Sequence, residues 1–291
     1  MMNTLQKDNP ISTQNVREAS IGRILLESGK ITPEHAERIL RFQKEKGVRF
    51  GEAAQSLGLV SEADIQQVLA RQFDYAYLQP NQTKYPAELV AAYQPFSPQV
   101  EVLRAIRSQL MLRWFALGNK SLVIAGIESK GGSSLFLSNL AIVFSQLGEK
   151  TLVVDANLRR PSQHTTFNIK NKLGLSDVIA GRAGLEAIEK VEGFSNLFVL
   201  QAGTPVPNPQ EIVSRTELKD LLNNLHSQFD VVLLDVPAFS VGADALTVAS
   251  NVGGVVMVAR KHETRLENIN NINELLAFTK AQIVGSVLLD F

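Results

Sequence analysis

The feature that most constrains the fold of this chain is a glycine-rich segment that directly follows a short apolar run. Residues 122–126 read Leu-Val-Ile-Ala-Gly, and residues 127–134 continue Ile-Glu-Ser-Lys-Gly-Gly-Ser-Ser. A buried strand, a glycine-rich turn and small hydroxyl residues at the start of a helix form the pattern of a phosphate-binding loop. In such a loop, backbone N–H groups and the positive end of the helix dipole face an anion. The segment therefore predicts a nucleotide-binding α/β fold.

The loop departs from the full motif because the lysine that reaches the outer phosphates is missing. Counting from Gly126 puts Gly132 at the lysine position, whereas counting from the next residue puts Ser133 there and Ser134 at the magnesium-binding hydroxyl. The helix predicted from Ser134 favours the second register. Lys130 lies three positions away and is either a substitute for the missing lysine or a solvated loop residue. The loop residues predicted to contact a nucleotide are Gly126, Lys130, Gly131, Gly132, Ser133 and Ser134.

Composition excludes several classes of function. The chain has 291 residues with 29 basic and 29 acidic side chains, so it lacks the basic excess that binding to a nucleic-acid polymer requires. It contains no cysteine, which excludes disulfides and thiolate metal sites. No apolar run reaches the ~20 residues of a membrane span, and the polar start lacks the order of a signal peptide. We therefore expect a cytoplasmic protein with one large domain and one small one.

Composition also changes along the chain and predicts four segments. After residue 121, short β-branched apolar runs alternate with amphipathic stretches, which indicates an α/β domain with a doubly wound, mostly parallel sheet. Four prolines between Leu78 and Pro98 favour a linker over regular structure. The segments are a disordered tail at 1–18, a helical repeat domain at 19–78, a linker at 79–99 and the α/β domain at 100–291.

The elements expected in the α/β domain begin with a helix from Val100 to Leu117. The predicted strands are Ser121–Ala125, Thr151–Asp155, Leu197–Gln201, Val231–Asp235, Gly254–Ala259 and Ile283–Leu289. The predicted helices are Ser134–Gln146, Leu175–Ala180, Gly184–Ile188, Gln210–Ser227, Val241–Ala249 and Arg265–Lys280. Because ligands bind beyond the carboxyl ends of parallel strands, we expect the site at that edge of the sheet.

Two aspartates end predicted strands and complete a candidate site. Asp155 follows Thr-Leu-Val-Val, and Asp235 follows four apolar residues. Asp235 is predicted to hold Mg²⁺, commonly through water, and Asp155 to orient the water shell or to act on a nucleophile. One such strand is weak evidence, but two of them downstream of a glycine loop are strong together. Ser134, Asp155 and Asp235 are therefore the predicted magnesium site, and the two aspartates are the predicted catalytic groups.

From about residue 100 onward the chain resembles the bacterial tyrosine kinases of polysaccharide export, within the wider group of MinD/ParA-type ATPases. Glu101, Arg104 and Arg107 match that family's self-association motif, and the run from Asp155 to Pro161 resembles its second Walker box. The resemblance implies ATP or ADP and Mg²⁺ as cofactors. It also implies a homo-oligomer and a membrane-bound polysaccharide chain-length regulator as partner, so that the protein would be peripheral at the inner membrane.

Departures from that family bear on activity. The lysine position holds Gly132 or Ser133, and Asn157 replaces the second aspartate of the Walker box, although an amide is a poor general base. The chain also ends without the family's tyrosine cluster. Losing a charged group aimed at a transferring phosphoryl costs about 10²–10⁵ in rate. We therefore expect a regulatory pseudokinase that binds nucleotide through Asn157 and Arg159, with an active kinase, a MinD/ParA-like positioning ATPase and a nucleotide-free scaffold as alternatives.

Residues 20–72 contain an internal repeat of two 24-residue copies separated by five residues. Each copy predicts a short helix, a turn and a longer helix, with Thr32 and Ser61 as N-caps. The repeat resembles the N-terminal domain of type II secretion and pilus ATPases, some of which bind cyclic di-GMP. The residues that this resemblance implies for cyclic di-GMP are Gly22, Arg49 and Gly51. The first copy has Ser20 where an arginine is expected, so a helical adaptor that docks a partner protein is the alternative.

Overall fold

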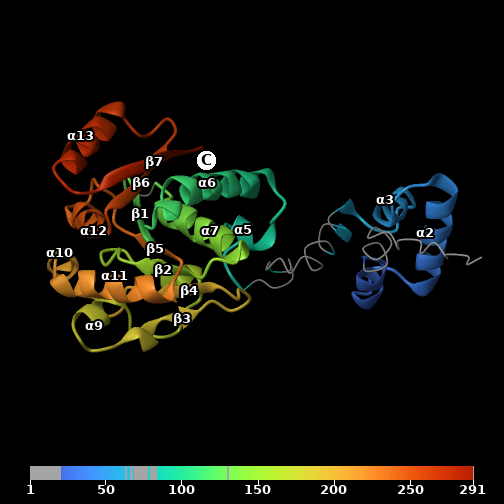
Figure 1. Ribbon diagram of the computed structural model, residues 1–291, viewed down its shortest axis with the longest axis horizontal. Helices are drawn as coiled ribbons and strands as arrows, with labels where there is room; N and C mark the ends of the chain where they lie inside the picture. Colours follow the sequence, from blue (N-terminus) through green and yellow to red (C-terminus); the bar gives the residue numbers. More distant parts are fainter. Residues whose placement is uncertain are drawn as a thin grey trace, which may run out of the picture. The chain divides into compact units, whose positions relative to one another are not determined.

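The computed structural model describes residues 21–62, 64–65, 68, 78, 84–129 and 131–290. The chain divides into two compact units, residues 1–76 and 77–291, and each has its own hydrophobic core (Figure 1). The predicted tail at 1–18 and the predicted loop ligand Lys130 lie outside the described residues. In the described parts of the chain, no helix is both long and apolar enough to cross a membrane.

The N-terminal unit consists of two similar helical halves. Gly29 and Gly58 end the first helix of each half with φ angles of 67° and 64°, and Thr32 and Ser61 cap the helix that follows. The helices include residues 21–27, α2 (Pro33–Lys46) and α3 (Phe50–Ser56). Core residues 29 positions apart take equivalent places: Leu25 with Ala54, Ile31 with Val60, and Ile39 with Val68. The repeat in the sequence is thus a repeat in the structure.

The second unit contains a seven-stranded sheet. Its strands are β1 (Ser121–Gly126), β2 (Thr151–Asp155), β3 (Glu189–Lys190), β4 (Leu197–Leu200), β5 (Val231–Asp235), β6 (Gly254–Arg260) and β7 (Gln282–Leu289). They lie in the order β3-β4-β2-β5-β1-β6-β7, and every neighbouring pair is parallel except β3 with β4. The predicted fold class is confirmed. The edge strand β3 was not predicted because two residues are too short to form a pattern.

Helices cover both faces of this sheet (Figure 1). The principal ones are α5 (Val90–Tyr93), α6 (Pro98–Arg113), α7 (Ser133–Gln146), α9 (Leu175–Ile179), α11 (Thr216–Gln228), α12 (Asp244–Val252) and α13 (Leu266–Ala277). Helix α7 packs on β1, β2 and β5 and is covered in turn by α5 and α6. On the opposite face, Val123 and Ala125 of β1 share a core with residues of α9, α11, α12 and α13. Because both faces are covered, the central strands are buried throughout, which explains their unbroken apolar sequences.

The predicted linker at 79–99 is wrong for its described part, residues 84–99. Tyr85 and Leu89 are buried, and α5 contacts α7, where the Ala91 N–H donates to the Asn139 side chain at 2.9 Å. The Tyr85 hydroxyl also donates to the Glu192 carbonyl at 2.8 Å. Prolines prevent a long helix here, but they do not prevent short turns from burying apolar side chains. This segment therefore belongs to the α/β unit.

Three predicted helices are interrupted or shortened. The helix predicted from Val100 to Leu117 ends at Arg113 and is followed by a separate 3₁₀ turn, η1 (Phe115–Leu117). The helix predicted at Gln210–Ser227 is interrupted by extended backbone at Arg215, whose φ and ψ are −70° and 150°. It forms α10 (Pro209–Val213) and α11. The helix predicted at Gly184–Ile188 is a single 3₁₀ turn, η2 (Leu185–Ala187). The short helix α8 (Gln163–Thr166) was not predicted, and it proves important for the site.

Candidate nucleotide site

The sheet order brings the glycine-rich loop and both aspartates to one edge. Strand β1 lies beside β5, which lies beside β2, and the three strands are parallel. Asp155 and Asp235 end their strands and are direct neighbours in the β2–β5 register. Both strand ends therefore lie at the edge of the sheet where the loop leaves β1, which is the position where parallel α/β sheets bind ligands.

The loop is shaped around its glycines. Gly132 has a left-handed φ of 76° and is the N-cap of α7, so Ser133 opens the helix and Ser134 follows in the first turn. A Cβ atom at Gly131 would lie 3.2 Å from the Glu128 carbonyl oxygen, and one at Gly126 would meet that oxygen and the Ser133 hydroxyl at the same distance. This close backbone turn at the start of a 14-residue helix fits a phosphate group, because its N–H groups are not shielded by side chains.

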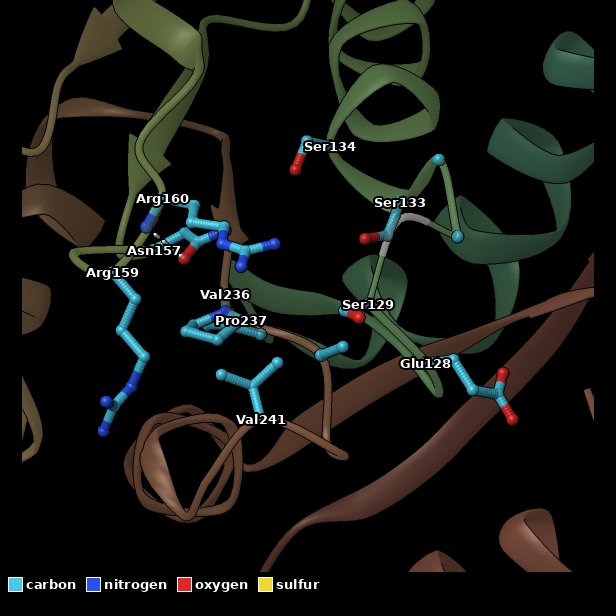
Figure 2. A pocket seen from close by; sticks show the side chains of 13 residues that line it. Glu128, Ser129, Ser133, Ser134, Asn157, Arg159, Arg160, Val236, Pro237 and Val241 are labelled. Carbon is cyan, nitrogen blue, oxygen red and sulfur yellow. Dashed lines mark hydrogen bonds between the residues drawn. The ribbon is translucent and has the colours of Figure 1, made fainter.

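The acidic residue of the loop is held away from this pocket. Glu128 accepts hydrogen bonds from the Thr264 hydroxyl at 2.6 Å and from the Asn268 side chain at 3.0 Å. Figure 2 shows its carboxylate turned outward from the serines of the loop. The negative charge of Glu128 therefore ties the loop to the start of α13 and does not face the space where a phosphate would lie.

Asp235 is fully buried and is bound by two side chains. The Ser134 hydroxyl donates to its Oδ1 at 3.0 Å, and the Gln163 amide donates to its Oδ2 at 2.7 Å. The Gln163 oxygen in turn accepts from the Ser138 hydroxyl at 2.8 Å. Burial raises the pKa of Asp235, while its two donors oppose that rise. Ser134 is thus brought to Asp235 as its place in the motif predicts. Sequence analysis missed Gln163, because a four-residue helix is too short to show a periodic pattern that would mark its buried glutamine.

Asp155 is also fully buried, but backbone groups surround it. Its Oδ2 accepts the N–H groups of Ser162 and Gln163, both at 2.9 Å, and its Oδ1 accepts that of Asn157 at 3.2 Å. Burial, and then the charge of neighbouring Asp235, raise the pKa of Asp155, and the three N–H donors oppose the rise. Asp155 therefore fixes the loop that leads into α8, whatever part it takes in binding a ligand.

The two arginines that follow Asn157 point in different directions. Arg159 forms an ion pair with buried Asp244 on α12, with 3.0 Å between its Nε and the carboxylate. Arg160 extends over the pocket toward the serines of the loop, as Figure 2 shows. The predicted ligands Asn157 and Arg159 both line this pocket, but the guanidinium of Arg159 is already engaged. The next residue, Arg160, faces the centre of the pocket.

The side chains of this site offer only part of the ligand set of a magnesium ion. The hydroxyl of Ser134 and the carboxylate of Asp235 are the hard oxygen donors that Mg²⁺ takes, and they already lie together. Among the described residues, no three histidine, cysteine or acidic side chains form a group that could hold a metal ion. A metal here would therefore rely on water and on the phosphates of a nucleotide for its remaining ligands, which is the usual way in which Mg²⁺ is bound.

The three predicted self-association residues lie on α6 and have different surroundings. Glu101 and Arg104 form an ion pair with each other, and the side chain of Glu101 is exposed. Arg107 is buried and donates to the Val143 carbonyl of α7 at 2.7 Å. Arg107 is thus turned into its own domain, and of the three residues only Glu101 has a largely exposed side chain.

The residues predicted for cyclic di-GMP have local roles in the N-terminal unit. Gly22 packs on the ring of Phe50, which would lie 3.1 Å from an added Cβ, and Gly51 faces Ile65. Arg49 is exposed and is the N-cap of α3, where its backbone N–H donates to Glu52 at 3.2 Å. Close packing inside the N-terminal unit, between the two halves at Gly22 and within the second half at Gly51, therefore explains both glycines without a ligand.

Together, the parallel sheet, the glycine loop at the end of β1 and the acidic strand ends define a P-loop nucleotide-binding fold. The chain is 31% identical over 200 residues to the tyrosine-protein kinase YwqD of Bacillus subtilis, a match that covers 69% of this chain and 84% of that one. The chain thus belongs to the family of bacterial tyrosine-protein kinases. No model of a protein family matches it.

Solved structures agree with this membership. The kinase domain of the Escherichia coli tyrosine kinase ETK superposes with a TM-score of 0.68 at 29% identity, over 75% of this chain and 85% of that one. The chimerical protein CapA2B2 superposes with a TM-score of 0.65 at 30% identity, over 77% and 97%. The cell division ATPase MinD of Pyrococcus furiosus, at 24% identity and a TM-score of 0.51 over 58% of this chain and 71% of that one, shares the fold.

Some relatives are much longer. The match to a Klebsiella pneumoniae protein described as a tyrosine-protein kinase in the cps region, 32% identical over 260 residues, covers 86% of this chain but only 35% of that protein. The chain therefore corresponds to about a third of the length of this relative.

Proposed function

We propose that this chain is a regulatory member of the tyrosine kinase family that binds ATP or ADP weakly with Mg²⁺ and transfers phosphoryl groups poorly. The observation that carries this proposal is the start of α7, where Gly132 caps the helix and Ser133 occupies the position of the missing lysine. Ser134 supports it, because its hydroxyl lies on Asp235 as a magnesium-binding residue would. The backbone donors for a phosphate are kept, while the loop position that normally supplies a cation carries a hydroxyl.

Two features favour binding over catalysis. Backbone N–H groups and Asp235 remain as ligands for a phosphate and a metal, whereas loss of one charge-stabilising group costs about 10²–10⁵ in rate. Asn157 adds to the deficit, because its side-chain oxygen accepts the Arg160 N–H at 3.2 Å and an amide cannot take up a proton as a carboxylate does. The site is thus better suited to sensing nucleotide than to turning it over.

The test measures nucleotide binding by calorimetry, together with ATP hydrolysis and phosphorylation of a tyrosine-containing polypeptide. The variants are Asp235→Ala and Ser133→Lys, and Asp220→Ala on the exposed face of α11 is the matched control. Binding without turnover in the wild type, lost in Asp235→Ala, supports the proposal, and Ser133→Lys should then raise turnover. Turnover in the wild type would instead favour an active kinase or a MinD/ParA-like positioning ATPase. Absence of any binding would favour a nucleotide-free scaffold.

We propose further that the α/β unit self-associates through α6 and acts in the cytoplasm beside a membrane-bound polysaccharide chain-length regulator of the exopolysaccharide system. The exposed side chain of Glu101 and the kinship with tyrosine kinases support this assignment. Light scattering tests self-association: Glu101→Arg should lower the mass of the assembly, while Glu217→Arg on α11 should not. An unchanged mass in the first variant would contradict the role of α6.

For the N-terminal unit we propose a helical adaptor, because packing against Phe50 and Ile65 already explains Gly22 and Gly51. Cyclic di-GMP binding at Arg49 is the second candidate, supported by the repeat itself. Calorimetry of the full chain with cyclic di-GMP separates the two. If no heat is released at high micromolar cyclic di-GMP, the adaptor role is supported. If heat is released by the wild type and by Arg41→Ala but not by Arg49→Ala, the unit binds the dinucleotide at Arg49.

A further inference from the structure

One cation that lines the pocket beside the glycine loop, Arg160, is left unused by the ion pairs described above. The charged residues that line the described part of this pocket are Glu128, Arg159 and Arg160. Glu128 is engaged by Thr264 and Asn268, and Arg159 is paired with Asp244. In the part of the chain that the structure describes, Arg160 has no carboxylate partner, so its charge is available to a ligand in this pocket.

The loop before α8 fixes the direction of Arg160. Its backbone N–H donates to both the carbonyl and the side-chain oxygen of Asn157, each at 3.2 Å, which closes a tight turn. Asn157 is itself anchored, because its N–H donates to buried Asp155 at 3.2 Å. Pro161 follows and restricts the backbone of Arg160 to extended conformations. The backbone of Arg160 is therefore tied to the buried carboxylate of Asp155 through Asn157.

Arg160 lies opposite the loop position that lacks a positive charge. Figure 2 shows its guanidinium reaching from the end of β2 toward Ser133 and Ser134, across the space that a phosphate on the loop would occupy. Ser133 supplies no charge at the lysine position. A guanidinium has five donors in a planar fork and pairs with phosphate oxygens in a bidentate manner. A cation that follows strand β2 thus faces the loop position from which the lysine is missing.

We infer that Arg160 is the phosphate-binding cation of this site and takes the place of the absent loop lysine toward the phosphates of ATP or ADP. Asn157 is a positioning residue for it, through the turn that its side chain closes. This inference rests on the proposed nucleotide binding and deepens it.

The experiment is calorimetric titration of the full chain with ATP, ADP and adenosine at low salt. The variants are Arg160→Ala, Arg160→Lys, Lys130→Ala and the control Arg113→Ala at the exposed end of α6. Fluorescence of Trp114, the single tryptophan, checks that each variant is folded. A hydrogen bond to a charged group contributes about 1.5–3 kcal/mol, so Arg160→Ala should weaken ATP and ADP binding roughly ten- to a hundredfold. Adenosine binding should not change, and Arg160→Lys should recover part of the loss.

Two results would overturn the inference, and they can be told apart. If the wild type binds ATP and Arg160→Ala binds it as tightly as Arg113→Ala does, Arg160 is not the cation and the proposed function stands. A loss confined to Lys130→Ala has the same meaning and assigns the role to Lys130. If the wild type binds neither ATP nor ADP, the proposed function fails, and the role of Arg160 fails with it.

Discussion

The buried glutamine of α8 allows a sharp test of how the acidic strand end is held. Gln163 is fully buried, and its amide nitrogen donates to the Asp235 carboxylate at 2.7 Å. Among the described side chains, only Ser134 also donates a hydrogen bond to this carboxylate. Substitution by Met keeps nearly the same volume and removes the donor, so the expected loss comes from the hydrogen bond and not from a cavity.

The magnitude follows from the charge of the acceptor. Hydrogen bonds to charged groups contribute about 1.5–3 kcal/mol, and a buried acceptor left short of donors keeps its full desolvation cost. Ser138 limits the loss elsewhere, because its hydroxyl can donate to the Ser134 carbonyl, 2.8 Å away, once the glutamine oxygen is gone. Gln163→Met should therefore lower the free energy of unfolding of the α/β unit by about 2 kcal/mol. Gln163→Ala should cost about 1–2 kcal/mol more, because it adds a cavity.

Urea unfolding followed by tryptophan fluorescence measures this change. Trp114 is the only tryptophan and is buried in the α/β unit, so it does not report on the N-terminal unit. With a typical urea slope, a loss of about 2 kcal/mol moves the midpoint by roughly 1 M. The control is Gln228→Met at the exposed end of α11, which should change stability by less than about 0.5 kcal/mol. If Gln163→Met and this control lose the same stability, the amide does not hold Asp235 and the reasoning fails.

Three further predictions concern other parts of the chain. The ammonium of Lys30 lowers the pKa of Asp64 to about 2, so the stability that this pair gives is present above pH 4 and is lost as pH falls from about 4 toward 2. Hydrogen exchange of α2 and α3 checks this, and Asp64→Asn should remove the acid-dependent part. Gly174→Ala should cost more than about 2 kcal/mol in urea unfolding, because the new Cβ would lie 2.2 Å from a backbone carbonyl, whereas Gly285→Ala, with open space, should be nearly neutral. Arg107→Met should lower thermal stability without changing the mass measured by light scattering, since its guanidinium bonds to α7, and a lower mass would contradict this.

Much of the fold was predictable because its signals are local. Strands buried on both faces read as apolar runs, and six of them fell where predicted. The cap residues Thr32 and Ser61 were equally visible, since a side-chain oxygen near the next turn is a short-range feature. The segment around Leu89 was misjudged, because its prolines are visible in the sequence while its burial against α7 depends on contacts from far along the chain.

By itself, the sequence predicted the candidate site: a glycine loop after β1, acids at the ends of β2 and β5, and no lysine at the position that the loop motif reserves for one. These features depend on residue type and spacing, which the chain carries locally. Only the tertiary structure decided which side chains meet there. It paired Arg159 with Asp244, aimed Arg160 at the loop and placed Gln163 on Asp235. The physical reason is that these contacts join residues up to 85 positions apart, so their geometry depends on strand order and on the direction of each turn.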